Sequence, residues 1–251
     1  MDTKLILLCM FGFLAQFIDS IAGGGGLISI PALMTFGIPP HFALGTNKFG
    51  AMFGTVSSTI GFIKSKKVHT PLLKYLVPCA AIGAVLGVNT VLLINQKYLN
   101  GLVLILLFIV SIYTIVKKDM GDEDKFTGID RRNIIIGCVI AFILGFYDGF
   151  FGPGTGAFLI FAFINFLGFD FLHSCGNAKV LNMISAITSF IVFAINGKII
   201  YSVGIPFAIS MILGAVVGTR VAIQNGKRLI KPIFILISVS FIIKLSMELI
   251  R

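Results

Sequence analysis

The feature that most constrains this chain is the length of its stretches without charged side chains. No Asp, Glu, Lys or Arg occurs in residues 75–96, 98–116, 149–169, 180–197 or 199–219. Each run has about 18 residues or more, which is the length that a helix needs to cross the roughly 30 Å hydrocarbon core of a bilayer. Because 57% of all residues are hydrophobic and 12% are charged, a water-soluble fold could not cover its surface with polar groups. The sequence predicts an all-α integral membrane protein.

The net charge of +10 has an ordinary explanation in such a protein. Lysines and arginines gather in short loops, as at 64–67 and 131–132, where basic residues orient a chain in the membrane. No soluble domain is available to bind nucleic acid, so that partner is not expected. The four cysteines are scattered and lack metal-ligand spacing, so neither a metal nor a cofactor is expected.

A polar segment at 117–132 divides the chain into two apolar parts and reads as an extramembrane linker. We expect a first transmembrane repeat at 1–116 and a second at 133–251. The two parts align over about 75 residues: Lys48 falls on Lys179 at an offset of 131 (179 − 48). Such internal repeats are characteristic of secondary transporters.

Further matches support this alignment. Segment 83–87 falls on 214–218 at the same offset, and Asp19 falls on Asp148 at 129. Residues 5–23 could also be read as a cleavable signal peptide, but the recurrence of their pattern in the middle of the chain favours a mature segment.

Each repeat is expected to hold four elements with pseudo-twofold symmetry between the repeats. The first element is broken by glycines, at 4–37 and 133–168. Helices are expected to follow at 41–63, 72–94, 98–116, 172–195, 202–224 and 229–250. If the broken element crosses the membrane once, the repeats are parallel; if it is a re-entrant hairpin, they are inverted. The distribution of Lys and Arg favours neither, and the resemblance of broken elements to half-helices that meet at the bilayer midplane favours inverted repeats.

The glycine clusters that break the first elements are candidate anion sites. Non-helical backbone in a membrane must line a wet cavity or pack within protein, and a helix that restarts after the break presents free N–H groups and partial positive charge. Close helix packing is the alternative role for these glycines. The candidate residues in the clusters are Gly23, Gly24, Gly25, Gly26, Gly152, Gly154, Thr155 and Gly156.

Charged side chains within the apolar segments are candidate functional residues as well. Lys48 and Lys179 each lie about 10 Å into a helix, where an ammonium group is costly and marks a pathway or an ion pair, unless it snorkels to the headgroups. Asp19 and Asp148 could form ion pairs with the lysines or carry coupling protons, and the sequence supports both roles. Polar neighbours that could line the same cavity are Asn47, Asn177 and Asn182.

Three segments carry a resemblance to a known family: FIDSIAGGGGLISIPALMTFGIPPHFALGTNKF at 17–49, GFYDGFFGPGTGAF at 145–158 and HSCGNAKVLN at 173–182. They resemble the sulfite exporter TauE/SafE family of bacterial membrane transporters, and within it the YfcA-type branch. The resemblance implies a multi-pass carrier of the bacterial inner membrane for small sulfur-containing anions such as sulfite and organosulfonates. It also implies that the glycine clusters and the lysine-bearing helices form the substrate region.

The sequence therefore predicts a secondary transporter of small anions that works by alternating access between two repeats, and not an enzyme. An anion channel with the same lining is one alternative. A membrane-embedded enzyme is a less favoured alternative, because no nucleophile set or carboxylate dyad is apparent. The expected partners are a small anion, the lipid bilayer, a coupling proton or cation, and a second copy of the chain in a homodimer.

Overall fold

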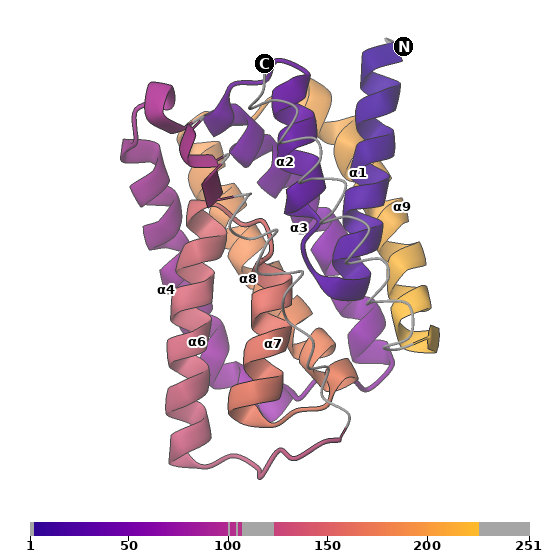
Figure 1. Cartoon of the computed structure of the whole chain (residues 1–251), viewed down its shortest axis with the longest axis vertical. Helices are drawn as coiled ribbons and strands as arrows, with labels where there is room; N and C mark the ends of the chain where they lie inside the picture. Colours follow the sequence, from indigo (N-terminus) through magenta and orange to yellow (C-terminus); the bar gives the residue numbers. More distant parts are fainter. Residues whose placement is uncertain (1–2, 100, 104, 107–122, 226–251) are drawn as a thin grey trace.

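The computed structural model describes residues 3–99, 101–103, 105–106 and 123–225, and the regular elements found there are α-helices. Five of them, α1, α4, α6, α8 and α9, are long and apolar enough to cross a membrane, which confirms an all-helical chain built for a bilayer. The expected helix at 229–250 and most of that at 98–116 lie outside the described residues. The bounds are α1 Thr3–Ala22, α2 Gly26–Thr35, α3 Pro40–Lys64, α4 Thr70–Leu93, α6 Arg131–Phe150, α7 Thr155–Leu167, α8 Phe171–Ile195 and α9 Tyr201–Asn225 (Figure 1).

The helix ends follow local sequence signals. Pro40 is the first residue of α3, where the missing N–H of proline costs nothing. Asp130 accepts a hydrogen bond from the Asn133 amide at 2.7 Å and so caps α6, and Asp170 caps α8 through the His173 amide at 2.9 Å. Such caps satisfy amides that have no partner within the helix.

The first glycine cluster turns the chain back on itself. Gly23 and Gly24 have φ values of 70° and 117°, which glycine adopts without the strain that a side chain would add. Leu8 of α1 and Leu33 of α2 then belong to one buried cluster, so α2 returns beside α1 (Figure 1). With 10 residues, α2 is only about 15 Å long, too short to cross a bilayer.

The second glycine cluster makes a similar hairpin from α6 and α7. Gly152 and Gly154 have φ values of 98° and 82°. The Lys125 amide, which precedes α6, donates to the Gly168 carbonyl at the end of α7 over 2.7 Å. Both broken elements are thus helical hairpins, and Figure 1 shows them starting from opposite ends of the molecule, with their tips near mid-height.

Glycines also bring two pairs of helices into backbone contact. A Cβ added at Gly83 or Gly87 of α4 would collide with main-chain atoms of α6, and one at Gly214 or Gly218 of α9 would collide with main-chain atoms of α1. Small residues allow this close approach in membrane proteins. Each tight pair joins one helix from either side of the 117–132 segment.

Replacement of Gly87 by alanine is expected to destabilise the protein by about 1–3 kcal/mol, since the new methyl group would force α4 away from the Phe146 carbonyl of α6. The matched control is Gly101→Ala, because a Cβ there meets no atom of a described residue within 4 Å. Thermal unfolding of both variants in the same detergent measures the difference. Equal melting temperatures would contradict the tight packing of α4 on α6.

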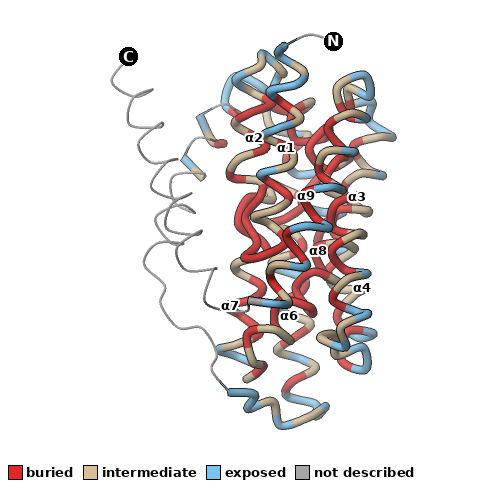
Figure 2. The backbone as a smooth tube through the Cα atoms, turned by 90° about the vertical axis from the view of Figure 1, so that its right-hand side faces the viewer, coloured by how far each residue is buried: buried red, intermediate tan, exposed pale blue. Residues whose placement is uncertain are grey.

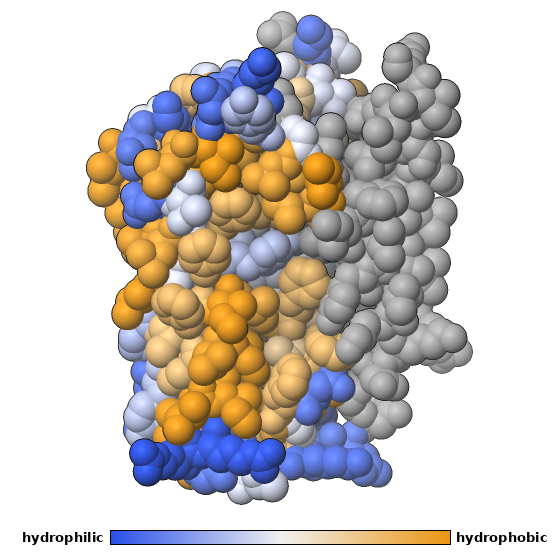
Figure 3. All heavy atoms as spheres, turned by 60° about the vertical axis from the view of Figure 1, so that its left-hand side comes forward, coloured by the Kyte–Doolittle hydropathy of each residue, from blue (hydrophilic) through white to orange (hydrophobic). Residues whose placement is uncertain are grey.

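The outer surface is suited to lipid rather than water. Figure 2 shows buried residues concentrated where the helices meet. Large apolar side chains are exposed at many positions, for example Ile143 and Leu213 at 56% and 57%. Figure 3 shows an apolar surface between hydrophilic ends on the face in view, which is the pattern of a protein that spans a bilayer.

Candidate functional site

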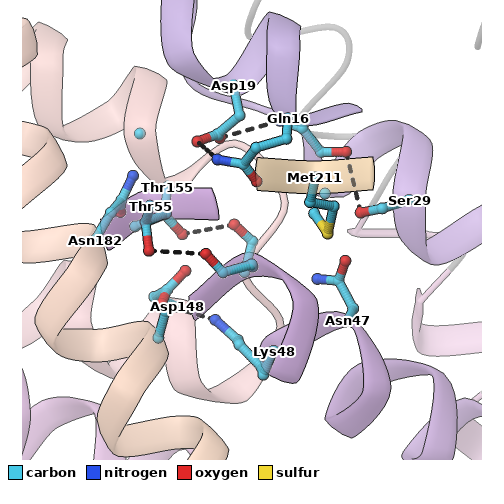
Figure 4. Close-up of a pocket in the computed structure, with 16 residues that line it drawn as sticks. Gln16, Asp19, Ser29, Asn47, Lys48, Thr55, Asp148, Thr155, Asn182 and Met211 are labelled. Atoms are coloured by element: carbon cyan, nitrogen blue, oxygen red, sulfur yellow. Dashed lines mark hydrogen bonds and ion pairs between the residues drawn. The ribbon is translucent and has the colours of Figure 1, made fainter. Parts of the chain in front are cut away.

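A small cavity lies where the tips of the two hairpins meet the central helices α3 and α8 (Figure 4). Its volume is about 40 Å³, and a single water needs about 10–15 Å³, so the cavity has the size of a few waters or one small ion. Its lining comes from both sides of the 117–132 segment: Gln16, Asp19, Gly25, Gly26, Ser29, Asn47, Lys48, Ala51, Thr55, Asp148, Gly152, Thr155, Gly156, Asn182, Ala186 and Met211.

Most of the residues that the sequence singled out meet in this cavity. Those that line it are Gly25, Gly26, Asn47, Lys48, Gly152, Thr155, Gly156, Asn182 and the two acids Asp19 and Asp148. Those that do not are Gly23, Gly24, Gly154, Asn177 and Lys179. The amide oxygen of Asn177, for example, accepts a hydrogen bond from the His69 amide at 2.8 Å and holds the start of α4 against α8.

Lys48 of α3 forms an ion pair with Asp148 of α6 at the wall of the cavity. Lys48 Nζ lies 2.7 Å from Asp148 Oδ2, and the two side chains are 5% and 9% exposed. The same carboxylate oxygen accepts a hydrogen bond from Ser185 Oγ at 2.6 Å. Lys48 is the only Lys or Arg among the described residues that lines the cavity.

Lys179 of α8 forms the corresponding pair with Asp19 of α1, but Lys179 does not line the cavity. Lys179 Nζ lies 2.7 Å from Asp19 Oδ2 and its side chain is 1% exposed. It also donates to the Asp19 main-chain carbonyl. The two ion pairs therefore cross between the two parts of the chain, each joining the lysine of one to the aspartate of the other.

The helix starts at the hairpin tips leave amide groups for a ligand. The amides of Gly24 and Gly25 donate to Asp19 Oδ1 at 3.1 and 3.2 Å, so the carboxylate already occupies them. For the amides of Gly26 and Gly156, at the starts of α2 and α7, no hydrogen bond to a described residue is found. Both glycines line the cavity, where such amides and the helix dipole favour an anion.

Two asparagines give a further sign that the cavity holds a polar ligand or water. The side-chain carbonyl oxygens of Asn47 and Asn182 are buried and have no hydrogen-bond partner among the described residues. Both side chains line the cavity, and Figure 4 shows Asn47 beside Lys48. Because a buried polar atom without a partner is costly, water or a donor-bearing ligand in this space would satisfy these oxygens.

Sequence reasoning missed several polar residues at this site. Gln16 Nε2 donates to Asp19 Oδ2 at 3.3 Å, and Thr55 lines the wall of the cavity. The repeat alignment held a usable signal, because Thr55 and Ala186 share the offset of 131 (186 − 55) and both line the cavity. For Ser185, adjacent to Ala186, the repeat alignment gave no comparable signal.

One group of side chains with the right atoms to bind a metal lies elsewhere among the described residues, where atoms of Asp124, Asp170 and His173 lie within 4.8 Å of one another. Asp170 already caps α8 and contacts His173 Nδ1 at 2.5 Å. Burial raises the pKa of Asp170, but hydrogen bonds from the backbone and side chain of His173 lower it more, so that it lies below its ordinary value. The geometry is accounted for by capping of the helix.

Comparisons with known proteins identify the family of this chain. The family model described as sulfite exporter TauE/SafE matches residues 8–245. A probable membrane transporter protein of Haemophilus influenzae is 37% identical over 94% of this chain and 92% of its own length. The probable membrane transporter protein YfcA of Escherichia coli K12 is 37% identical over 95% and 88%. No solved structure matches the chain. These matches confirm the resemblance seen in the sequence, and the chain belongs to the TauE/SafE family of membrane transporters.

Proposed function

We propose that this transporter carries small anions of the sulfur oxyanion class across the bacterial inner membrane. The observation that carries the proposal is the mid-height cavity lined by Lys48 and by two glycines at the starts of short helices, Gly26 and Gly156, whose amides have no hydrogen bond to a described residue. Oxygen atoms of a sulfite or sulfonate group would accept hydrogen bonds from these donors. The name sulfite exporter, carried by the family and by an Arabidopsis thaliana relative that is 32% identical over 89 residues, supports the same substrate class.

For an anion to bind, the ion pair between Lys48 and Asp148 at the cavity wall has to open. In the structure Lys48 is neutralised by Asp148, and Asp19 is neutralised by Lys179. An anion therefore binds by replacing the Asp148 carboxylate as the partner of Lys48. This exchange of partners distinguishes the binding site from a static structural ion pair.

We further infer that the two parts of the chain are inverted repeats. The support consists of the shared offset that relates Lys48 to Lys179, the reciprocal ion pairs and the hairpins that enter from opposite ends (Figure 1). Inverted repeats around a central site are the usual basis of alternating access.

The glycine contacts suggest which parts would move in such a cycle. Because α4 packs on α6 and α1 packs on α9 through main-chain atoms, each moving body would combine helices from both repeats. Rocking would then occur between the α1–α9 pair and the α4–α6 pair, rather than between the two repeats as separate bodies.

Purified protein in liposomes tests the proposal. We expect saturable uptake of sulfite, thiosulfate, sulfoacetate or taurine that exceeds that of protein-free liposomes at least 10-fold, and exchange of external against internal anion. Small carboxylates provide the comparison for selectivity. Large single-channel currents without saturation would indicate a channel instead, and the lack of flux for every anion tested would refute anion transport.

A further inference from the structure

The two buried ion pairs look equivalent in the sequence, but their surroundings differ. Both oxygens of Asp19 are engaged: Oδ1 accepts from the amides of Gly24 and Gly25, and Oδ2 accepts from Lys179 and Gln16. The Lys179 ammonium group in turn also binds the Asp19 main-chain carbonyl. These contacts fix the turn that follows α1 and leave the Asp19 carboxylate no further hydrogen-bond acceptor site for a cycle of binding and release.

Asp148 is less completely satisfied. Its Oδ2 accepts from Lys48 and Ser185, whereas its Oδ1 accepts no hydrogen bond from a described residue. Asp148 and its partner Lys48 both line the cavity, and Figure 4 shows the two side chains directed toward one another at its wall. A change in the ionisation of Asp148 therefore acts directly on the one ammonium group of the described chain that a substrate in this cavity can reach.

Charge balance then couples the anion to a proton. If an anion took the place of the Asp148 carboxylate beside Lys48 while that carboxylate stayed ionised, two negative groups would share one ammonium group in a poorly solvated space. Like charges at such a distance disfavour the ionised form of an acid. Uptake of one proton by Asp148 removes the conflict and leaves the total charge of the pair and its ligand at zero for a monovalent anion.

We propose that Asp148 is the proton-coupling residue and that the protein moves one proton together with each anion. On binding, a proton from the aqueous side forms an O–H bond with the Asp148 carboxylate, the contact between Lys48 Nζ and Asp148 Oδ2 opens, and Lys48 binds the anion. On release at the other side the anion leaves, Asp148 loses the proton to water, and the ion pair closes again. This inference rests on the proposed anion transport.

The groups around Asp148 in the described chain are few. Lys48 approaches from α3, Ser185 from α8 and the Tyr147 hydroxyl belongs to α6 itself. Asp19 faces the same cavity from α1 and is held by Lys179 of α8. Helix α7 and residues 80–93 of α4, which also pack near this part of α6, carry no titratable side chain. Asp148 is thus the group whose protonation can respond to the anion.

The test compares wild type with Asp148→Asn in liposomes, with thiosulfate and methanesulfonate as probes because both stay ionised between about pH 5.5 and 7.5. Binding and protonation are reciprocal, so wild-type uptake is expected to rise by up to about 10-fold per unit decrease in external pH. Uptake by Asp148→Asn is expected to change less than 2-fold over this range, and an inward proton gradient should no longer drive accumulation in it.

Two further variants give the controls. Glu123→Gln alters an acid that is 78% exposed and lies outside the cavity, and should keep the wild-type pH dependence. Ser185→Ala removes a donor to Asp148 and should shift the pH dependence toward higher pH. Wild-type flux that does not respond to pH, or Asp148→Asn flux that still does, overturns the coupling alone. No flux of any anion in wild type overturns the proposed function and the coupling with it.

Discussion

Replacement of Lys48 by glutamine is expected to lower the rate of anion transport at least 100-fold. Among the described residues Lys48 provides the only Lys or Arg side chain in the lining of the cavity, and a neutral amide would leave the bound anion without a countercharge. Initial rates of sulfite exchange in liposomes, normalised to the amount of folded protein, measure the loss.

Interpretation of this variant needs a matched control, because Asp148 loses its partner as well. Removal of one member of a buried pair typically costs about 3–5 kcal/mol. The double variant Lys48→Gln, Asp148→Asn removes both charges and should recover most of the melting temperature while transport stays lost. Wild-type transport rates in the double variant would show that Lys48 does not bind the substrate.

Replacement of Lys179 by methionine is expected to act on folding rather than on substrate binding. The change leaves the Asp19 carboxylate without its ammonium partner and removes one of the two donors to the Asp19 carbonyl in the last turn of α1, which keeps only the Gly23 amide, at a cost of about 3–5 kcal/mol. We expect a sharp decrease in the yield of monodisperse protein and in its melting temperature, measured by size-exclusion chromatography and thermal unfolding in detergent.

The second member of the pair again provides the control. In Lys179→Met, Asp19→Asn no charge is left unpaired, and the asparagine oxygen can still accept from the Gly24 amide, so part of the melting temperature should return, and transport with it. A Lys179→Met protein that is as stable as wild type but inactive would instead place Lys179 in the binding site, as the sequence suggested.

The helices could be predicted because their signals are local. The starts expected from the sequence at 41 and 172 lie one residue after the observed starts of α3 and α8. A proline stands at the first of these borders and an aspartate at the second. The return of each broken element as a helical hairpin could not be predicted from local signals. It depended on contacts such as that between Lys125 and Gly168, which join residues far apart in the sequence.

The residues of the candidate site could be predicted from the sequence, but not which of them are free to bind a ligand. The alignment identified Lys48 and Lys179 as equivalent, yet only Lys48 reaches the cavity, since Lys179 Nζ is bound by the carboxylate and the carbonyl of Asp19. Likewise the amides of Gly24 and Gly25 were candidate donors to an anion, and the structure shows that Asp19 occupies them. An alignment of the two parts of the chain does not tell which of two equivalent residues already has its hydrogen-bond or ion-pair partner within the protein.

The crossed ion pairs also have a consequence for the synthesis of the protein. Asp19 and Lys48 leave the ribosome first, while Lys179 and Asp148, their partners, follow 160 and 100 residues later. Until α6 and α8 have been made, the nascent first half holds an unpaired carboxylate and an unpaired ammonium group in segments bound for the bilayer, which is costly. The native ion pairs can therefore form only after translation has passed α8.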